Sequence, residues 1–234
     1  MSFANKTVLV TGAAGNLGKA VGGAFLAQGA RLVLFDISSA VLDASWPGDD
    51  VRIAKVAVNL LDPAATAAAV QGVLSDHAAI DVLCNIAGGF RMGPPIHETP
   101  GDLWSLMLDL NAGTLLNMAR AVVPGMLARR HGKIVNVGAL AGLAGRGAMG
   151  AYSASKSAVI RITESMAAEL REAGINVNCV LPSIIDTPQN RADMPDADPA
   201  RWVAPAALAD VITFLASDGA RAIHGAAVPV TGLS

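Results

Sequence analysis

A tyrosine and a lysine, Tyr152 and Lys156, form the pair of side chains best suited to chemistry, and this tyrosine is the only one in the chain. Positions i and i+4 share one face of a helix, so the phenol and the ammonium can reach a common pocket. A phenol ordinarily has a pKa of about 10, and a nearby ammonium lowers that pKa by favouring the phenolate. The spacing therefore predicts a group that transfers protons in an enzyme's active site.

A glycine-rich segment follows the first apolar run of the sequence. Gly12, Gly15 and Gly18 are spaced G-x-x-G-x-x-G between a predicted strand over residues 7–10 and a predicted helix to about residue 28. Glycines there let the backbone approach a pyrophosphate, whose charge the N-terminus of the helix stabilises. The segment predicts a nucleotide-binding loop.

Asp36 closes the next predicted strand, 36 − 18 = 18 residues after Gly18. A carboxylate at this point accepts hydrogen bonds from an adenosine ribose and repels a 2′-phosphate. No Lys or Arg occupies positions 13–16 or 37–39 to attract that phosphate. The sequence thus favours NAD(H) over NADP(H); an Asp that only caps the following turn is the alternative.

Apolar runs of strand length alternate with helical patterns along the whole chain. Such runs predict a parallel sheet covered by helices on both faces. We expect an α/β fold: a single Rossmann-type, doubly wound sheet of about seven strands in one domain, residues 1–234. Its two longest helices fall near 102–130 and 151–173, and a Pro- and Asp-rich lid loop falls at about 183–203. The strands are expected at 7–10, 31–36, 51–58, 81–86, 133–137, 175–180 and 227–230.

Composition excludes several classes of protein. The 234 residues carry a net charge of −2, which gives no reason to expect a polyanion partner. Although 53% of residues are hydrophobic, no charge-free run is long enough to span a bilayer, and the first residues lack a secretion signal. Cys84 and Cys179 fall in apparent strands as reduced core thiols, and the four His are too scattered for a metal site. We expect a cytoplasmic protein.

Taken together, the motifs resemble the short-chain dehydrogenase/reductase family over essentially the whole chain. Thr11 to Gly18, Asp36, Asn85-Ile86-Ala87-Gly88, Asn111, Tyr152 with Lys156, and Pro182 to Thr187 follow the order and spacing of that family. The resemblance implies a nicotinamide cofactor and Tyr152 as general acid/base. It implies that Lys156 binds the nicotinamide ribose and tunes Tyr152, and that Asn111 holds a water of a proton relay.

The resemblance also implies which residues contact the cofactor. Asn85 to Gly88 would line the adenosine side, and Thr187 would meet the carboxamide. The full set of cofactor-binding candidates is Gly12, Gly15, Asn16, Leu17, Gly18, Asp36, Asn59, Leu60, Asn85, Ala87, Gly88, Tyr152, Lys156, Pro182, Ile185 and Thr187.

Three positions depart from the family pattern. Ala139 stands where the family commonly has a Ser that donates a hydrogen bond to the substrate oxygen; losing such a donor typically costs on the order of 10²–10³ in rate. Asn16 replaces a usual Gly, and Asn tolerates left-handed backbone geometry better than most residues. Ser183 replaces the Gly of a usual Pro-Gly pair.

One branch of the family, the quinonoid dihydropteridine reductases, resembles this chain locally. That branch also lacks the Ser, has a similar stretch over residues 180–202, and carries an aromatic residue after the paired glycines, here Phe90. Ala139 and Phe90 are therefore expected in the substrate pocket. Phe90 either stacks on a flat substrate ring or packs within its own loop, and Trp202 is expected to anchor the next helix rather than cover substrate.

Three functions stay open at this point. The first is an NAD(H)-dependent reductase or dehydrogenase of a small carbonyl/alcohol pair. The second is the reduction of a quinonoid dihydropterin, and the third is a non-catalytic NAD-binding protein. The resemblance also implies a homotetramer or homodimer, assembled through the two longest helices.

Overall fold

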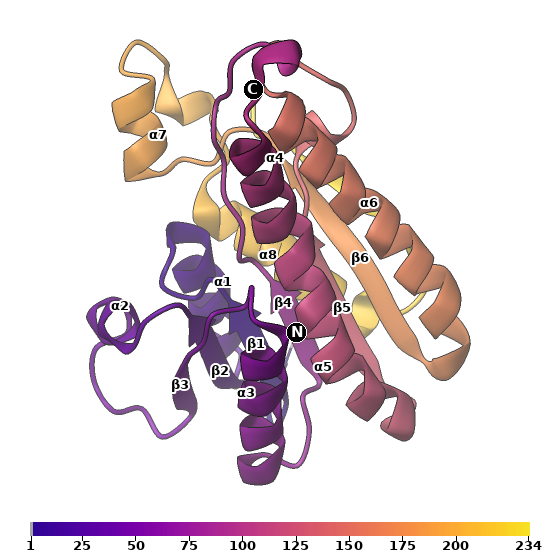
Figure 1. Cartoon of the computed structure of the whole chain (residues 1–234). Helices are drawn as coiled ribbons and strands as arrows, with labels where there is room; N and C mark the ends of the chain where they lie inside the picture. Colours follow the sequence, from indigo (N-terminus) through magenta and orange to yellow (C-terminus); the bar gives the residue numbers. More distant parts are fainter. Residues whose placement is uncertain (1) are drawn as a thin grey trace.

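The computed structural model describes residues 2–234, and seven parallel strands form its single sheet in the order β3-β2-β1-β4-β5-β6-β7 (Figure 1). This is the predicted Rossmann-type sheet, and each predicted strand is present within a few residues. The bounds are β1 Thr7–Thr11, β2 Arg31–Asp36, β3 Ile53–Ala57, β4 Val82–Asn85, β5 Gly132–Val137, β6 Ile175–Pro182 and β7 Ala227–Val230.

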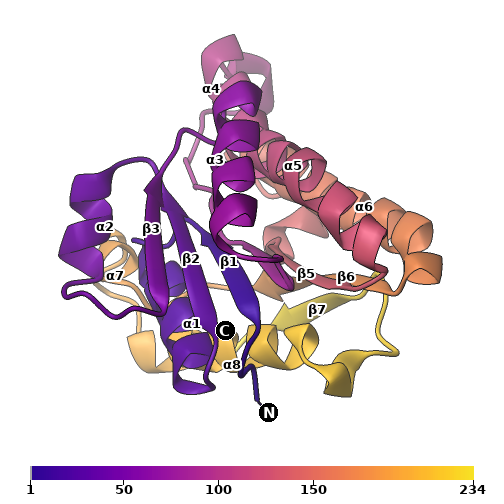
Figure 2. The same cartoon turned by 90° about the horizontal axis from the view of Figure 1, so that it is seen from below.

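Helices cover both faces of the sheet, because successive strand residues point to opposite sides and both sides are apolar. Val8 and Val10 of β1 pack in one core with Phe25 of α1, whereas Leu9 packs in the other core with Met118 of α5. Figure 2 shows α1 and α8 on one side and α3, α5 and α6 on the other. The helices are α1 Asn16–Ala27, α2 Ser39–Ser45, α3 Pro63–Asp76, α4 Gly101–Leu108, α5 Thr114–Arg129, α6 Gly150–Leu170, α7 Pro188–Asp193 and α8 Pro205–Ala216.

The strand order reverses between β1 and β4, and ligands of such sheets bind beyond the carboxyl ends of the strands at this switch point. There the hydroxyl of Thr11 accepts the backbone N–H groups of Ile86 (3.0 Å) and Ala87 (3.1 Å). Gly12, with φ of +62°, runs so close that a Cβ on it would lie 2.9 Å from the Ala87 Cα. The two loops that border the switch point are thus held together by one hydroxyl and one glycine.

The expected helix at 102–130 is interrupted. Between α4 and α5, residues Asp109–Gly113 form a π-helical turn, and this turn carries the buried Asn111. Such turns are rare and frequently occur at functional sites. A π-helical turn adds one residue to the helix. The sequence pattern does not reveal this residue, because apolar residues continue on both sides of the turn.

The lid contains more regular structure than a loop. Thr187 caps α7 by accepting the Asn190 N–H at 3.1 Å, and Pro188 occupies the first helical position. The prediction of a loop was therefore wrong over Pro188–Asp193, although Thr-Pro is a recognisable start signal. Trp202 is buried, in keeping with the predicted anchor.

Cys84 and Cys179 are buried and unbridged, as expected of core thiols. Within residues 2–234, no helix is both long enough and apolar enough to cross a bilayer.

Candidate active site

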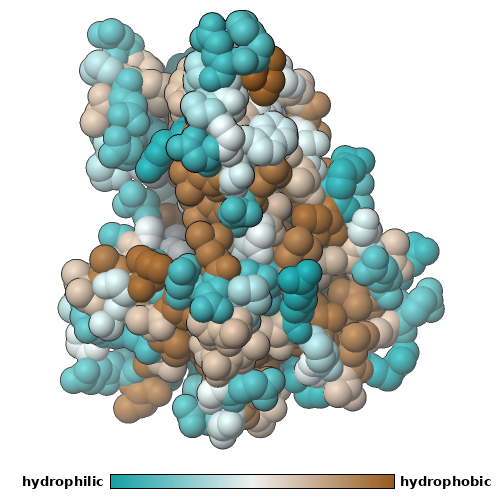
Figure 3. Space-filling model, in the orientation of Figure 1, coloured by the Kyte–Doolittle hydropathy of each residue, from teal (hydrophilic) through white to brown (hydrophobic). Residues whose placement is uncertain are grey.

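A cleft of about 1450 Å³ opens beyond the carboxyl ends of the strands. Figure 3 shows the hollow beside the α7 segment, at the upper left of the molecule. Most of the residues singled out from the sequence line this one cleft. They are Gly12, Gly15, Asn16, Leu17, Gly18, Asp36, Asn59, Leu60, Ala87, Gly88, Phe90, Ala139, Tyr152, Lys156, Pro182, Ile185 and Thr187.

The glycine-rich loop brings backbone, not side chains, to the cleft. A Cβ on Gly18 would collide with the Gly12 carbonyl oxygen, so α1 can pack against the loop only with a glycine there. Gly15 precedes α1, and no side chain caps this end of the helix. Free N–H groups at a helix N-terminus beside a glycine cradle suit a phosphate-bearing ligand.

Asn16 is the first residue of α1 and has helical geometry. Among residues 2–234, the non-glycine residues with positive φ are Asn5, Arg130 and Ala148. The left-handed tolerance of Asn is therefore not used at position 16, and replacement of the family's glycine causes no backbone strain there.

Asp36 lies half-buried at the end of β2, where its carboxylate borders both the loop and the cleft. One carboxylate oxygen accepts the Ala14 N–H at 2.9 Å, and the other accepts the Ile37 N–H at 2.8 Å. Each oxygen can accept a further hydrogen bond. Asp36 thus fixes the glycine-rich loop while keeping acceptor capacity for a ligand hydroxyl.

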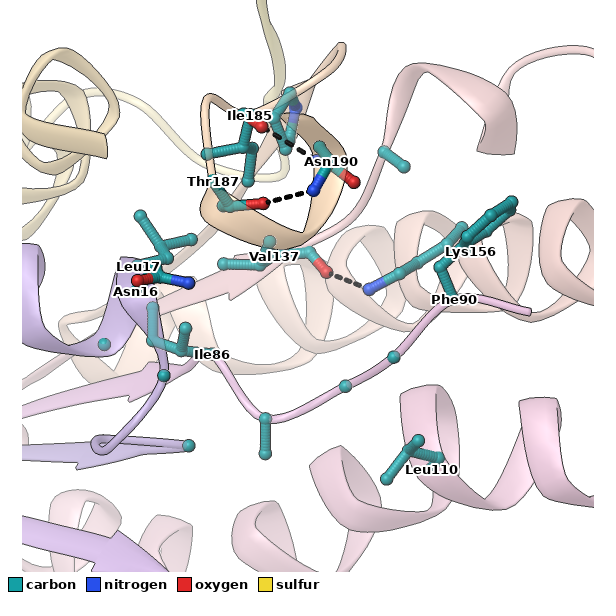
Figure 4. A pocket seen from close by; sticks show the side chains of 18 of the residues that line it. Asn16, Leu17, Ile86, Phe90, Leu110, Val137, Lys156, Ile185, Thr187 and Asn190 are labelled. Carbon is teal, nitrogen blue, oxygen red and sulfur yellow. Dashed lines mark hydrogen bonds between the residues drawn. The ribbon is translucent and has the colours of Figure 1, made fainter. Parts of the chain in front are cut away.

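Lys156 lies on α6, at the opposite end of the cleft from Asp36. Its ammonium donates a hydrogen bond to the Val137 carbonyl at the end of β5, 2.9 Å away, as Figure 4 shows. The side chain is buried, and this desolvation lowers the pKa of Lys156 to about 8. A Cβ on Gly88 would lie 3.4 Å from the Lys156 nitrogen, so the loop after β4 passes directly over the ammonium.

Tyr152 behaves differently from the expectation based on Lys156. Burial raises the pKa of the Tyr152 phenol to about 12. The predicted lowering by the ammonium was wrong for the protein without ligands, because the Lys156 ammonium is directed at Val137 and desolvation dominates at the phenol. At neutral pH Tyr152 is therefore a phenol that can give up a proton.

Asn111 lies beneath the cleft rather than in its lining. Its amide nitrogen donates to the Gly89 carbonyl (3.0 Å) and to the Ser155 hydroxyl (3.0 Å), and its amide oxygen accepts the Gly89 N–H (3.0 Å). Ser155 in turn donates to the Tyr152 carbonyl at 2.7 Å. The side chain of Asn111 is thus engaged with the protein, and its predicted contact with a relay water remains a prediction.

Asn85 does not line the cleft, contrary to the prediction that it borders the adenosine side. It pairs with Asn136 on the neighbouring strand, to which its amide nitrogen donates at 2.9 Å. Asn136 then donates to the Thr163 hydroxyl of α6 at 2.9 Å. The side chain points along the sheet into the interior, so Asn85 connects β4 to β5 and α6.

At the substrate end, Ala139 presents a buried methyl group where the family pattern has a hydroxyl. The ring of Phe90 packs against the ring of Tyr152 in an edge-to-face arrangement, with centroids 4.9 Å apart and planes at 85°. Phe90 is nevertheless 45% exposed and lines the cleft. Neither prediction for Phe90, stacking on a substrate ring or packing within its own loop, describes it fully, because its ring packs on Tyr152, the candidate catalytic residue.

The lid is tied to the rest of the site through its own polar groups. Asn190 of α7 donates to the Ile185 carbonyl at 2.8 Å, beside Thr187 (Figure 4). Ser183, which replaces a usual glycine, donates to the Thr231 carbonyl at 2.9 Å. The extra hydroxyl of Ser183 thus joins the start of the lid to the chain after β7.

Several residues of the site were missed from the sequence. Thr11 was part of the glycine-rich motif, but no sequence signal indicated that its hydroxyl bonds the loop after β4, or that the Ser155 hydroxyl bonds Asn111. Further lining residues that the sequence did not reveal are Leu140, Ala141, Arg146, Met149 and Met194. They come from loops whose approach to one another only the fold determines.

Comparisons with known proteins give a consistent answer. Residues 6–198 match the family model described as short chain dehydrogenase. The chain is 32% identical to 2-(R)-hydroxypropyl-CoM dehydrogenase of Xanthobacter autotrophicus, over 97% of this chain and 98% of the relative. It is 30% identical to 3-oxoacyl-(acyl-carrier-protein) reductase of Vibrio cholerae, over 99% of this chain and 98% of the relative.

Solved structures agree with these sequence matches. NAD⁺-bound xylitol dehydrogenase superimposes with a TM-score of 0.91 at 25% identity, covering 99% of this chain and 100% of that one. Levodione reductase superimposes with a TM-score of 0.88 at 26% identity, covering 98% of this chain and 97% of that one.

The buried ammonium of Lys156 predicts a specific pH dependence of stability. Folding lowers its pKa from 10.5 to about 8, so between these values the unfolded chain binds more protons and stability rises with pH. Below pH 8 both states are protonated and the cost of burial is constant. Relative to Lys156→Met, the wild type should therefore gain at most about 3 kcal/mol in free energy of unfolding between pH 7 and pH 10.

Urea denaturation of both proteins across this pH range measures the difference. Lys19→Met, at an exposed lysine of α1, is the matched control and should show a difference from wild type that does not vary with pH. A flat difference for Lys156→Met as well would mean that the ammonium is not desolvated.

Proposed function

Since the chain belongs to the short-chain dehydrogenase/reductase family of NAD(P)-dependent oxidoreductases, we propose that it transfers hydride between NAD(H) and a small carbonyl or alcohol substrate. The observation that carries the proposal is the continuity of one cleft from Asp36 and the glycine-rich loop to Lys156 and Tyr152. Its volume of about 1450 Å³ exceeds the roughly 300–1,000 Å³ of ordinary ligand pockets, which suits a dinucleotide together with a small substrate.

The choice of NAD(H) over NADP(H) rests on Asp36. Its carboxylate borders the cleft, has acceptor capacity for ribose hydroxyls, and would repel a 2′-phosphate. Neither positions 13–16 nor positions 37–39 offer a cation. The similar structure of xylitol dehydrogenase has NAD⁺ bound, which supports the same cofactor for this chain.

The residues present fit such a cofactor. The glycine cradle and the uncapped start of α1 would hold the pyrophosphate, and Lys156 would hold the nicotinamide ribose. When bound, the nicotinamide supplies or accepts the hydride. Further contacts would come from Asn59, Leu60, Ala87 and Gly88 on the adenosine side and from Pro182, Ile185 and Thr187 of the lid.

Tyr152 would supply the proton in reduction. With a pKa of about 12 it is protonated throughout the neutral range, so it can donate to a carbonyl oxygen as hydride arrives. Oxidation needs the phenolate, which is scarce at neutral pH.

The substrate class follows from what surrounds Tyr152. The relatives named above include no dihydropteridine reductase, so the pterin alternative depends only on Ala139 and the local motif similarity. The names of the two relatives from Xanthobacter and Vibrio instead refer to hydroxyalkyl and oxoacyl compounds, which support a carbonyl/alcohol pair. A non-catalytic role is disfavoured because Tyr152 and Lys156 both line the cleft.

We propose in addition that the chain acts as one domain whose lid, residues 183–203, closes over the nicotinamide end, and that it assembles through its two longest helical segments, α4–α5 and α6. Figure 3 shows some apolar side chains among polar ones over α4 and α5, where Trp104, Leu106 and Leu116 are each about 40% exposed. Single surface apolar residues are common, and several of them on two consecutive helices suit a dimer or tetramer interface. Sedimentation as a monomer at micromolar concentration would contradict the assembly.

The test of the function is NADH consumption by purified protein, offered small ketones and quinonoid dihydropterin in parallel. We expect turnover of ketones, and Tyr152→Phe should lower it by at least about 10²-fold because the proton donor is gone. The same variant should bind NADH normally, since the phenol hydroxyl contributes little to cofactor affinity. Binding of NADH without turnover of any substrate, and no change in Tyr152→Phe, would support the non-catalytic alternative.

Ala139→Ser separates the two substrate classes. The variant restores a hydroxyl beside Tyr152, and one hydrogen-bond donor to a developing oxyanion is worth on the order of 10²–10³ in rate. A gain of at least about tenfold in kcat with ketones is expected if the enzyme is a carbonyl reductase lacking this donor. Ala139→Gly is the control for size. No gain on ketones, together with fast wild-type turnover of the pterin, would favour the pterin reaction.

A further inference from the structure

The ring of Tyr152 has no polar restraint of its own in the described chain. Among residues 2–234, the Tyr152 carbonyl accepts a hydrogen bond from the Ser155 hydroxyl, whereas no protein group forms a hydrogen bond with the Tyr152 phenol hydroxyl. Ala139, which follows β5 and lines the same cleft, offers no hydroxyl partner either. The ring does make an edge-to-face contact with Phe90.

This contact has a favourable geometry. Its centroid separation of 4.9 Å and interplanar angle of 85° place the positive edge of one ring over the negative face of the other. Phe90 also shields the Tyr152 ring from water, and burial is the cause of the raised pKa of Tyr152. The exposed part of Phe90 faces the cleft.

The backbone that carries Phe90 is fixed on both sides. Gly89 exchanges two hydrogen bonds of 3.0 Å with the side chain of Asn111. Beyond Phe90, the Gly93 N–H donates to the Ala148 carbonyl, 2.8 Å away, just before α6. A Cβ on Gly88 would lie 2.6 Å from the Asn111 oxygen, so this approach requires a glycine.

These contacts form a closed circuit that begins and ends at Tyr152. The Tyr152 carbonyl accepts from Ser155, Ser155 accepts from Asn111, Asn111 clamps Gly89, and Phe90 returns to the Tyr152 ring. The π-helical turn of residues 109–113 places Asn111 within reach of both Ser155 and Gly89. A single helical irregularity thus fixes the Phe90 segment relative to the start of α6.

We propose that Phe90 is a positioning residue for the reaction: held by Asn111, it fixes the ring of Tyr152 in its proton-donating orientation at a site that lacks the hydroxyl at position 139. The inference rests on the proposed function, because it assigns Phe90 a task in the proton transfer by Tyr152. It also gives Asn111 a positioning task, exerted through Gly89 and Phe90.

The chain offers an unusually direct test, because Tyr152 is its only tyrosine. Ultraviolet titration of tyrosinate therefore reports the pKa of this one residue, with Tyr152→Phe as the blank. In Phe90→Ala, the pKa should fall from about 12 toward the ordinary value of about 10, since water reaches the ring. Phe90→Trp, which keeps an aromatic ring, should stay close to the wild type.

Kinetics supply the second readout. Phe90→Leu, which keeps apolar bulk but loses the ring, should lower kcat for reduction by on the order of tenfold with an unchanged KM for NADH, because the donor is misoriented. Phe90→Trp should restore kcat. Phe214→Leu and Phe214→Ala are matched controls at a partly exposed phenylalanine of α8, outside the cleft, and should change neither readout.

A third measurement serves for any variant that unfolds at the high pH needed to titrate Tyr152. Biosynthetic 3-fluorotyrosine labels only position 152 and has a more acidic phenol, so one ¹⁹F resonance follows its titration under milder conditions. Unchanged tyrosinate titration and kcat in Phe90→Leu and Phe90→Ala, or an effect confined to the KM for substrate, would overturn the proposal. If the wild type consumes NADH with none of the substrates, the proposed function fails, whereas the titration still tests the contact between the two rings.

Discussion

The hydrogen bond from the buried Lys156 ammonium to the Val137 carbonyl is the constraint on which the site depends. A buried ammonium without a partner costs several kcal/mol, and one carbonyl at the end of β5 offsets only part of that cost. The bond fixes the start of α6 against the sheet, which places Tyr152 one helical turn away at the same end of the cleft. Burial lowers the pKa of Lys156 to about 8, so this position is unfavourable for a cation and the charge does not stabilise the fold.

One end of the cleft, at the glycine-rich loop, is lined mainly by backbone, whereas the end at Lys156 is lined mainly by side chains. Thr11 and Gly12 bring the loops after β1 and β4 into contact, and the uncapped start of α1 faces the same space. The polar side chains Tyr152 and Lys156 and the lid residues of the cleft come from later elements, α6 and the segment after β6. The cleft is therefore formed by elements that lie more than a hundred residues apart in the sequence.

The strands and the glycine-rich loop were predictable because they depend on local composition. A run such as Arg31–Asp36 is apolar on both faces, which is typical of a buried strand. Gly12 and Gly18 stand where the backbone packs too closely for a Cβ, and their spacing shows this in the sequence. The direction of Asn85 was not predictable, because it depends on the register that pairs it with Asn136. The pKa of Tyr152 was predicted in the wrong direction, since spacing reveals a neighbouring charge but not the burial that outweighs it.

The effect of Ala139 depends on the side chains that surround it in the folded site. The methyl group is buried, the phenol of Tyr152 is desolvated, and Phe90 packs on its ring, so the substrate end is more apolar than the family pattern suggests. Such surroundings strengthen the interaction of the remaining polar groups with a substrate oxygen.

Calorimetric titration of the purified chain with NADH and with NADPH tests most directly whether one cleft holds NAD(H) between Asp36 and Lys156. NADH should bind at least about tenfold more tightly, a difference of about 1.4 kcal/mol. Asp36→Asn should narrow that gap mainly by strengthening NADPH binding, whereas Lys156→Met should weaken both cofactors alike. Equal or tighter binding of NADPH by the wild type, or no response to either substitution, would contradict this assignment of the cleft.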